Sequence, residues 1–187
     1  TIKRKKFDII IFDLGLSSNQ INDPKRGFSF MKEGPLDMDM GGSMIRASEV
    51  INNFSERKLA DIFFELGEER YAKRIARNIV KHRNIKLIDN TKKLSELIKE
   101  SIPKTNSKKR KINPATKTFQ ALRIYVNDEL NELKTALSKS SQLLNKEGKL
   151  IVVSFQSLED RIVKDFFTHS SGKRWRSPRH YPELADK

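Results

Sequence analysis

Residues 7–20 read Phe7-Asp8-Ile9-Ile10-Ile11-Phe12-Asp13-Leu14-Gly15-Leu16-Ser17-Ser18-Asn19-Gln20. The apolar run up to Asp13 lacks the alternation of a half-buried strand, so it predicts a strand buried on both faces and central in a parallel sheet. The run ends in a carboxylate, a glycine and two serines, and open α/β sheets bind ligands just beyond the carboxyl ends of their strands. Asp13 is therefore the first candidate functional residue. The alternative is that Asp13 only shapes a turn, as aspartates close to glycine often do.

A second unbroken apolar run, residues 149–155, also ends in polar residues and predicts a parallel partner strand. The separation of the two runs exceeds what one crossover helix needs by about a hundred residues. The chain is therefore expected to be an α/β, Rossmann-like protein with an inserted, mostly helical subdomain.

Composition narrows the class of partner. The formal net charge is +14 and the pI is near 10.0, which favours a polyphosphate partner over a membrane surface. No apolar run approaches the roughly 18 residues of a spanning helix, and no secretory signal is present, so a cytoplasmic protein without a membrane partner is expected. The chain has no cysteine and three scattered histidines, which predicts no metal site. Because it begins Thr1-Ile2-Lys3 without an initiator methionine, a fragment is expected.

Helical patterns fill most of the region between the two runs and continue beyond the second. The pattern predicts helices over 55–66 with Ser55 as N-cap, 68–83, 91–102, 114–144 starting at Pro114, and 157–167 starting with Ser157 as a capping residue.

The helix expected over 68–83 has an apolar face and an opposite basic face. The basic residues are Arg70, Lys73, Arg74, Arg77 and Lys81, with no acidic residue interleaved. Cations that forgo carboxylate partners one turn away favour contact with RNA phosphates, and the alternative is an ordinary solvated face.

The segment 20–44 is loop-like and holds all four methionines of the chain, Met31, Met38, Met40 and Met44. These methionines either pack the loop onto the domain or form a flexible lid over the ligand edge. Residues 104–111 carry five cations and form either a tether or an RNA-facing arm. Residues 173–176 combine three cations with the single tryptophan.

The chain carries six ordered motifs that resemble those of one family. They are Asp13-Leu14-Gly15-Leu16-Ser17-Ser18-Asn19-Gln20, Arg26-Gly27-Phe28-Ser29-Phe30, Gly34-Pro35-Leu36-Asp37-Met38, Gly67-Glu68-Glu69-Arg70, Ala115-Thr116-Lys117-Thr118-Phe119-Gln120-Ala121-Leu122-Arg123-Ile124 and Ser157-Leu158-Glu159-Asp160-Arg161-Ile162-Val163-Lys164.

These motifs resemble the bacterial small-subunit (16S) ribosomal RNA cytosine-N4 methyltransferases, the RsmH/MraW family. The resemblance implies a class I, Rossmann-like core that uses S-adenosylmethionine, with a helical substrate-recognition insert between the fourth and fifth strands. It implies cofactor contacts at Asp13 and Gln20 and, as substrate, a cytidine of 16S rRNA in the small ribosomal subunit. On this basis residues 1–20 and 113–187 are expected to form a partial methyltransferase core, and residues 21–112 a helical subdomain for RNA recognition.

The chain departs from the family pattern in three places. The family's glycine-rich loop after the first strand and its acidic residue after the second have no counterpart, because the chain begins later. Asn113 and Gln156 stand where the family has histidines. The usual C-terminal strands of the fold are also absent. The complete protein is expected to be an enzyme. This fragment alone is expected to be inactive, because it lacks these parts.

Cytosine chemistry gives Asp13 a second candidate role. An exocyclic amine is a poor nucleophile because its lone pair is delocalised into the ring, so a site must align it with a methyl sulfonium and accept its hydrogens. Asp13 or nearby backbone carbonyls are the candidate catalytic acceptors. A non-catalytic RNA-binding protein is the alternative from another class. A DNA adenine methyltransferase is disfavoured because Asn/Asp-Pro-Pro-Tyr/Phe is absent, and the oligomeric state, including a homodimer, stays open.

Overall fold

The computed structural model describes residues 6–103 and 112–172. The chain divides into two compact units. The strand unit comprises residues up to Gly15 and from Leu130 onward, and the helical unit comprises Leu16–Glu129. These boundaries differ from the expected ones at residues 20 and 113, because residues 113–129 pack with the helical unit.

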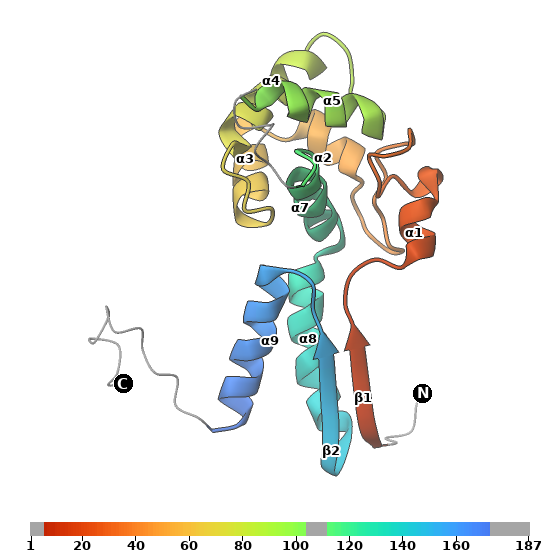
Figure 1. Cartoon of the computed structure of the whole chain (residues 1–187), viewed down its shortest axis with the longest axis vertical. Coiled ribbons are helices and arrows are strands. Elements are labelled where there is room, and N and C mark those ends of the chain that lie inside the picture. Colours follow the sequence, from red (N-terminus) through yellow and green to blue (C-terminus); the bar gives the residue numbers. More distant parts are fainter. Residues whose placement is uncertain (1–5, 104–111, 173–187) are drawn as a thin grey trace, which may run out of the picture. The chain divides into compact units, whose positions relative to one another are not determined.

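The strand unit contains β1 (Phe7–Asp13), α8 (Glu129–Leu143), β2 (Leu144–Val153) and α9 (Ser157–Ser170) (Figure 1). The two strands pair in parallel, with Ile11 beside Ile151 and Asp13 beside Val153. The predicted parallel pairing and the helix that feeds the second strand are confirmed. β2 begins five residues earlier than expected, at Leu144, opposite Phe7 and before an irregularity in the register.

Both helices of the strand unit cover the same face of the strand pair. Leu133 and Leu137 of α8 and Val163 of α9 form a buried cluster. Phe12 of β1, Leu14 just after it, and Leu150 and Val152 of β2 pack against this cluster. Period-two geometry makes these residues share one face, so the other residues of each strand point the opposite way.

The opposite face of the strand pair is apolar and exposed. Ile11 is 63% exposed, and Phe7, Ile9, Ile151 and Val153 are also largely exposed. The predicted burial of β1 on both faces is therefore wrong for this chain. Within the described residues β1 has one neighbouring strand, and helices cover only one of its faces.

The helical unit is built from short helices around one core (Figure 1). Its elements are α1 (Ser18–Asn22), the 3-10 helix η1 (Pro24–Arg26), α2 (Ala47–Asn53), α3 (Glu56–Glu65), α4 (Ala72–Arg83), α5 (Thr91–Ser101) and α7 (Thr116–Asn127). Fully buried core residues come from α2 to α7, among them Ile51, Phe63, Ile75, Leu97 and Leu122.

Helix boundaries confirm some predictions and correct others. Ser55 caps α3 as predicted, because its side chain accepts the Lys58 N–H. α4 begins at Ala72 rather than at residue 68, since Glu68 has a left-handed φ of 49° that no helix continues through.

The prediction of one long helix over 114–144 is wrong. This region forms two helices, α7 and α8, which are separated by Asp128. Asp128 ends α7 in a left-handed conformation with φ 49°. Pro114 lies two residues before α7 and is not its first residue. In α9 the N-cap is Gln156 and not Ser157, which is already the first helical residue.

The loop over 23–46 is tied together by close backbone packing. A Cβ on Gly27 would meet the Pro35 carbonyl oxygen at 2.0 Å, and one on Gly34 would meet the Pro24 carbonyl oxygen at 1.8 Å. Only glycine permits these approaches. The segment from Pro24 to Gly27 and the segment at Gly34 and Pro35 are therefore held in close contact.

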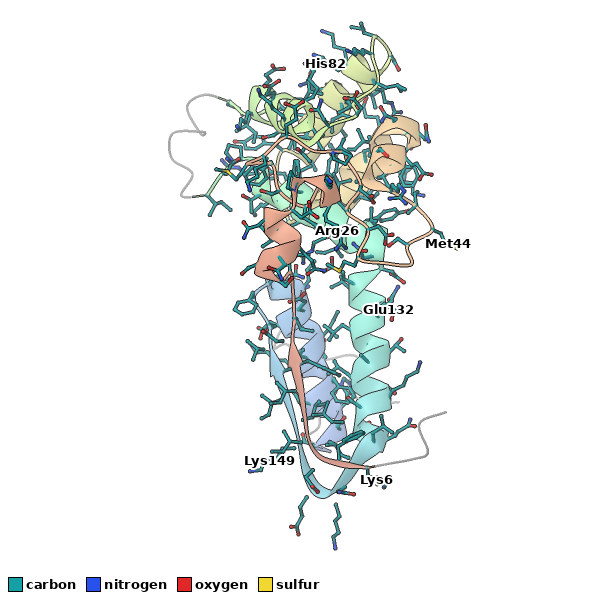
Figure 2. All side chains as sticks on the ribbon, turned by 90° about the vertical axis from the view of Figure 1, so that its right-hand side faces the viewer. Lys6, Arg26, Met44, His82, Glu132 and Lys149 are labelled. Atoms are coloured by element: carbon teal, nitrogen blue, oxygen red, sulfur yellow. The ribbon has the colours of Figure 1, made fainter. Side chains whose placement is uncertain are left out.

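The four methionines of the chain divide between the core and the surface. Met38 is fully buried and Met40 packs against the core, whereas Met31 and Met44 are exposed. Figure 2 shows Met44 on the outer side of its loop. The packing interpretation thus describes Met38 and Met40 and leaves the other two at the surface.

Candidate functional site

The carboxyl edge of the strand unit is formed where β1 and β2 end together. Asp13 closes β1 beside Val153, and the Leu14 N–H donates to the Val153 carbonyl oxygen at 3.0 Å. The Asp13 side chain is exposed, and within the described residues no hydrogen bond engages it. Its carboxylate is therefore available to a ligand at this edge.

β2 sends an aromatic residue to the same edge. Phe155 follows the end of β2 and is 78% exposed. α9 begins directly afterwards, and the Gln156 side-chain amide donates to the Glu159 carboxylate within its first turn. Gln156, which stands at a family histidine position, thus stabilises the first turn of α9.

Gln20 lies in the helical unit and caps α1. Its Oε1 accepts the Ser17 N–H at 2.9 Å, and the Ser17 hydroxyl oxygen accepts the Gln20 N–H at 3.3 Å. This is a capping box, which satisfies N–H groups at the helix start. The Gln20 amide oxygen thus already accepts one hydrogen bond, and its Nε2 group and second lone pair are what it can offer a cofactor.

The five predicted RNA-binding residues all lie at the surface of the helical unit. Arg70, Lys73, Arg74, Arg77 and Lys81 are exposed, whereas Ala72, Ile75, Ala76 and Ile79 on the opposite side of α4 are buried. We call these five residues the basic stripe. The predicted amphipathic division of α4 is confirmed, and its role in binding RNA stays a prediction.

Two members of the basic stripe differ from the sequence-based picture. Arg70 precedes α4, and its guanidinium lies 4.8 Å from the centre of the Tyr71 ring and donates to the Tyr71 hydroxyl at 2.9 Å. Arg77 pairs with Glu56 of α3 across 3.4 Å. A pattern along one helix cannot reveal a carboxylate from another helix, so the pair was missed. Both partners are substantially exposed, so the pair leaves Arg77 accessible.

A loop around Asp39 is held by a residue that the sequence did not single out. Asn127, the last residue of α7, donates to the Met38 carbonyl oxygen and accepts the Met40 N–H, each at 2.8 Å, and accepts the Ser43 hydroxyl at 3.0 Å. Asn127 lies outside the family motif that ends at Ile124, so no sequence signal pointed to it. Backbone N–H groups of Gly41 and Ser43 donate to the Asp39 carboxylate and hold its pKa at about 2.

Asn113 stands at the other family histidine position. Its side-chain oxygen accepts the Ala115 N–H at 3.0 Å, and its carbonyl oxygen accepts the Thr116 N–H at 3.1 Å. Both bonds shape the turn that leads into α7. The residue here has a local structural role.

The structure covers part of the predicted site. Asp13 belongs to the strand unit, and Gln20 and the basic stripe to the helical unit. The predicted basic segments 104–111 and 173–176 lie outside the described residues. Across 6–103 and 112–172, no three His, Asp or Glu side chains are grouped as metal ligands, and no helix has the length and apolar character to cross a bilayer.

The strand unit and its exposed carboxyl edge define an α/β protein whose candidate ligand site lies at the ends of parallel strands. The chain belongs to the MraW methylase family, whose model matches residues 1–186. This confirms the resemblance drawn from its motifs.

Individual relatives carry a more specific name. The chain is 52% identical over 172 residues to proteins named ribosomal RNA small subunit methyltransferase H from Rickettsia massiliae (strain Mtu5) and Rickettsia conorii (strain ATCC VR-613 / Malish 7). It is 51% identical to the protein of that name from Rickettsia canadensis (strain McKiel). The aligned residues cover 92% of this chain and 55% of each of these relatives, so the chain spans about half their length.

Proposed function

We propose that this chain forms part of an S-adenosylmethionine-dependent methyltransferase that methylates N4 of a cytidine in small-subunit ribosomal RNA. The observation that carries the proposal is the 52% identity to proteins named as small-subunit rRNA methyltransferases, together with the family match over residues 1–186. The free carboxylate of Asp13 at the carboxyl edge and the basic stripe on the helical unit support it.

The proposed reaction sets a clear requirement for the strand edge. S-adenosylmethionine would supply an electrophilic methyl group on a sulfonium. The amine of cytosine must be oriented so that its lone pair faces that methyl group, and the charge developing on nitrogen must be stabilised. Asp13 can do both by accepting an amine hydrogen, since its carboxylate is exposed and engages no hydrogen bond within the described residues.

The chain also offers groups that fit part of a cofactor site. A carboxylate at a strand end can accept hydrogen bonds from amino or hydroxyl groups of the cofactor, so Asp13 has a competing role there. Gln20 can donate from Nε2 or accept at the second lone pair of Oε1, whose first lone pair accepts the Ser17 N–H at 2.9 Å. A substitution at Gln20 therefore affects α1 as well as any ligand.

RNA binding is assigned to the basic stripe. Each exposed cation can neutralise a phosphate and release condensed counterions, which supplies affinity without base specificity. The stripe contains five cations, and of these Arg77 has a carboxylate partner within the described residues, Glu56. The cations support a polyphosphate partner, and the names of the relatives support 16S rRNA in the small ribosomal subunit as that proposed partner.

The test is methyl transfer by a full-length protein that carries these residues. Purified small subunits are incubated with the protein and labelled S-adenosylmethionine, and the rRNA is digested to nucleosides for mass spectrometry. The proposal expects N4-methylcytidine. Methylation of another nucleoside would refute the assignment to cytosine N4, and RNA binding without any transfer would favour a non-catalytic RNA-binding protein.

A further inference from the structure

A turn joins α4 to α5 (Figure 1). In this turn two large aliphatic residues stand on either side of a lysine. Ile85 is 82% exposed and Leu87 is 66% exposed. Lys86 between them is also exposed. We call residues 85–87 the apolar tip. Such side chains gain nothing for the folded unit from this position, because they stay in water.

The backbone around the apolar tip is braced rather than loose. The N–H groups of Ile85 and Lys86 both donate to the His82 carbonyl oxygen at 3.0 Å. On the other side, Ile88 is buried, its N–H donates to the Asn52 side-chain oxygen at 3.0 Å, and its carbonyl oxygen accepts from the Asn52 amide at 2.9 Å.

A further hydrogen bond secures the end of α4. The Arg83 guanidinium donates to the Ile51 carbonyl oxygen at 2.7 Å. Partial burial lowers the pKa of Arg83. The apolar tip is thus presented in a fixed shape, which reduces the entropy lost when it meets a partner.

The charges along the chain around the apolar tip are predominantly positive. Lys81, Arg83 and Lys86 lie before or within the tip, and one acidic residue, Asp89, follows it two positions after Leu87. Lys81 also belongs to the basic stripe, so the tip follows directly on the stripe along α4. An apolar protein partner would leave this excess of positive charge uncompensated, whereas RNA offers both phosphates for the cations and base faces for the aliphatic groups.

We propose that the apolar tip packs against unstacked bases of the RNA whose phosphates the basic stripe holds. This inference rests on the proposed RNA substrate and adds a preference for RNA structure to it. The stripe alone binds any polyanion, but Ile85 and Leu87 can gain contact area only where bases are splayed from the helix, as in loops and bulges. The helical unit would therefore prefer RNA with unpaired bases over a regular duplex.

The experiment compares the full chain with the double variant Ile85→Ser, Leu87→Ser. Binding is measured for an RNA hairpin with an unpaired loop, a duplex of equal length and inorganic polyphosphate, which has no bases. We expect the double variant to bind the hairpin roughly tenfold more weakly, because two aliphatic contacts are lost. Its affinity for duplex and polyphosphate, and its salt dependence, should stay unchanged.

Two further variants separate base contact from other effects. Ile85→Leu with Leu87→Met retains aliphatic bulk and should retain the hairpin affinity. Phe64→Ser is the matched control, since Phe64 is 65% exposed on α3 of the same unit and should not affect binding when changed. A 2-aminopurine placed in the hairpin loop should change its fluorescence with the wild-type chain and not with the double variant.

The outcomes distinguish this inference from the proposed function. Equal hairpin affinity of wild type and double variant would overturn the inference and leave RNA binding by the stripe intact. An equal loss on polyphosphate would overturn it too, because no base is present there. If the wild-type chain bound no RNA, both the inference and the proposed RNA substrate would fail.

Discussion

Asn127 and Met38 are joined by a hydrogen bond of 2.8 Å across 89 positions of sequence, from the Asn127 Nδ2 group to the Met38 carbonyl oxygen. Met38 needs this anchor, because it has a left-handed φ of 61° and is fully buried. A bulky residue in that region is strained, and strain persists only when surrounding contacts fix it. The loop before α2 is therefore held from the end of α7.

Replacing Asn127 by alanine should destabilise the helical unit by about 1–3 kcal/mol, because the Met40 N–H, the Met38 carbonyl and the Ser43 hydroxyl lose their partner together. Urea unfolding of the chain measures the change. Asn53→Ala is the control, since Asn53 is an exposed residue at the end of α2, and its change should stay within about 0.5 kcal/mol. Equal stabilities of the two variants would show that the Asn127 anchor contributes little.

The free energy of unfolding should depend on pH in the acid range through Asp39. Hydrogen bonds from Gly41 and Ser43 lower the pKa of Asp39 from 3.8 to about 2, so the ionised form is favoured in the folded state. A depressed folded pKa stabilises the protein above the unfolded pKa and loses that contribution as pH falls through about 2. Comparing urea unfolding of wild type and Asp39→Asn at several pH values, we expect the wild-type advantage to shrink between pH 4 and pH 2. A difference that does not change with pH would contradict this.

Asp13→Ala in a full-length methyltransferase that carries these residues should abolish methylation while thermal unfolding stays nearly unchanged, because the Asp13 carboxylate is exposed. Asp8→Ala is the matched control on β1, since Asp8 is also exposed and accepts a hydrogen bond from Asn145 at 2.7 Å. Initial rates with small subunits as substrate measure the effect. Activity of Asp13→Ala within about tenfold of wild type would remove Asp13 from the mechanism.

Gln20→Ala should have a milder effect, since a neutral amide contact contributes only about 0.5–1.5 kcal/mol net. A raised KM for S-adenosylmethionine is expected. The variant also loses the capping bond to Ser17, so its stability is measured alongside.

Changing Arg70, Arg74, Arg77 and Lys81 to glutamine should weaken RNA binding for unrelated sequences and reduce the slope of log affinity against log salt by up to about three. Filter binding at several salt concentrations measures both. The control variant changes four exposed lysines outside the basic stripe to glutamine, so that it loses the same net charge. These are Lys25, Lys92, Lys93 and Lys99. A slope reduced equally by both variants would show that net charge, and not the stripe, binds RNA.

The exposed face of the strand pair should make the chain self-associate. Uncovered apolar side chains and an unpaired strand edge favour association. Ile9→Thr with Ile11→Thr should reduce the associated fraction in sedimentation velocity, whereas Ile21→Thr in the helical unit should not. Monomeric behaviour of the wild-type chain would contradict the prediction.

The sequence by itself determined the local features of this protein. Unbroken apolar runs placed β1 and β2, and apolar periodicity gave the two faces of α4. The position of Ser55 before the helical pattern identified the cap of α3. These patterns depend only on residues close together in sequence. The six ordered motifs also indicated the family that the comparison confirmed. Net charge favoured a polyanionic partner before any fold was known.

Only the tertiary structure decided which surfaces are covered and which charges are paired. The exposed face of β1, the left-handed break at Asp128, the pairing of Arg77 with Glu56 and the three contacts of Asn127 with the loop before α2 each depend on residues from other elements of the chain or on backbone angles. The residues of a strand can predict that it is buried, but actual burial requires neighbouring elements on both of its faces. Physical proximity of residues distant in sequence is set by packing, so local patterns could not predict these features.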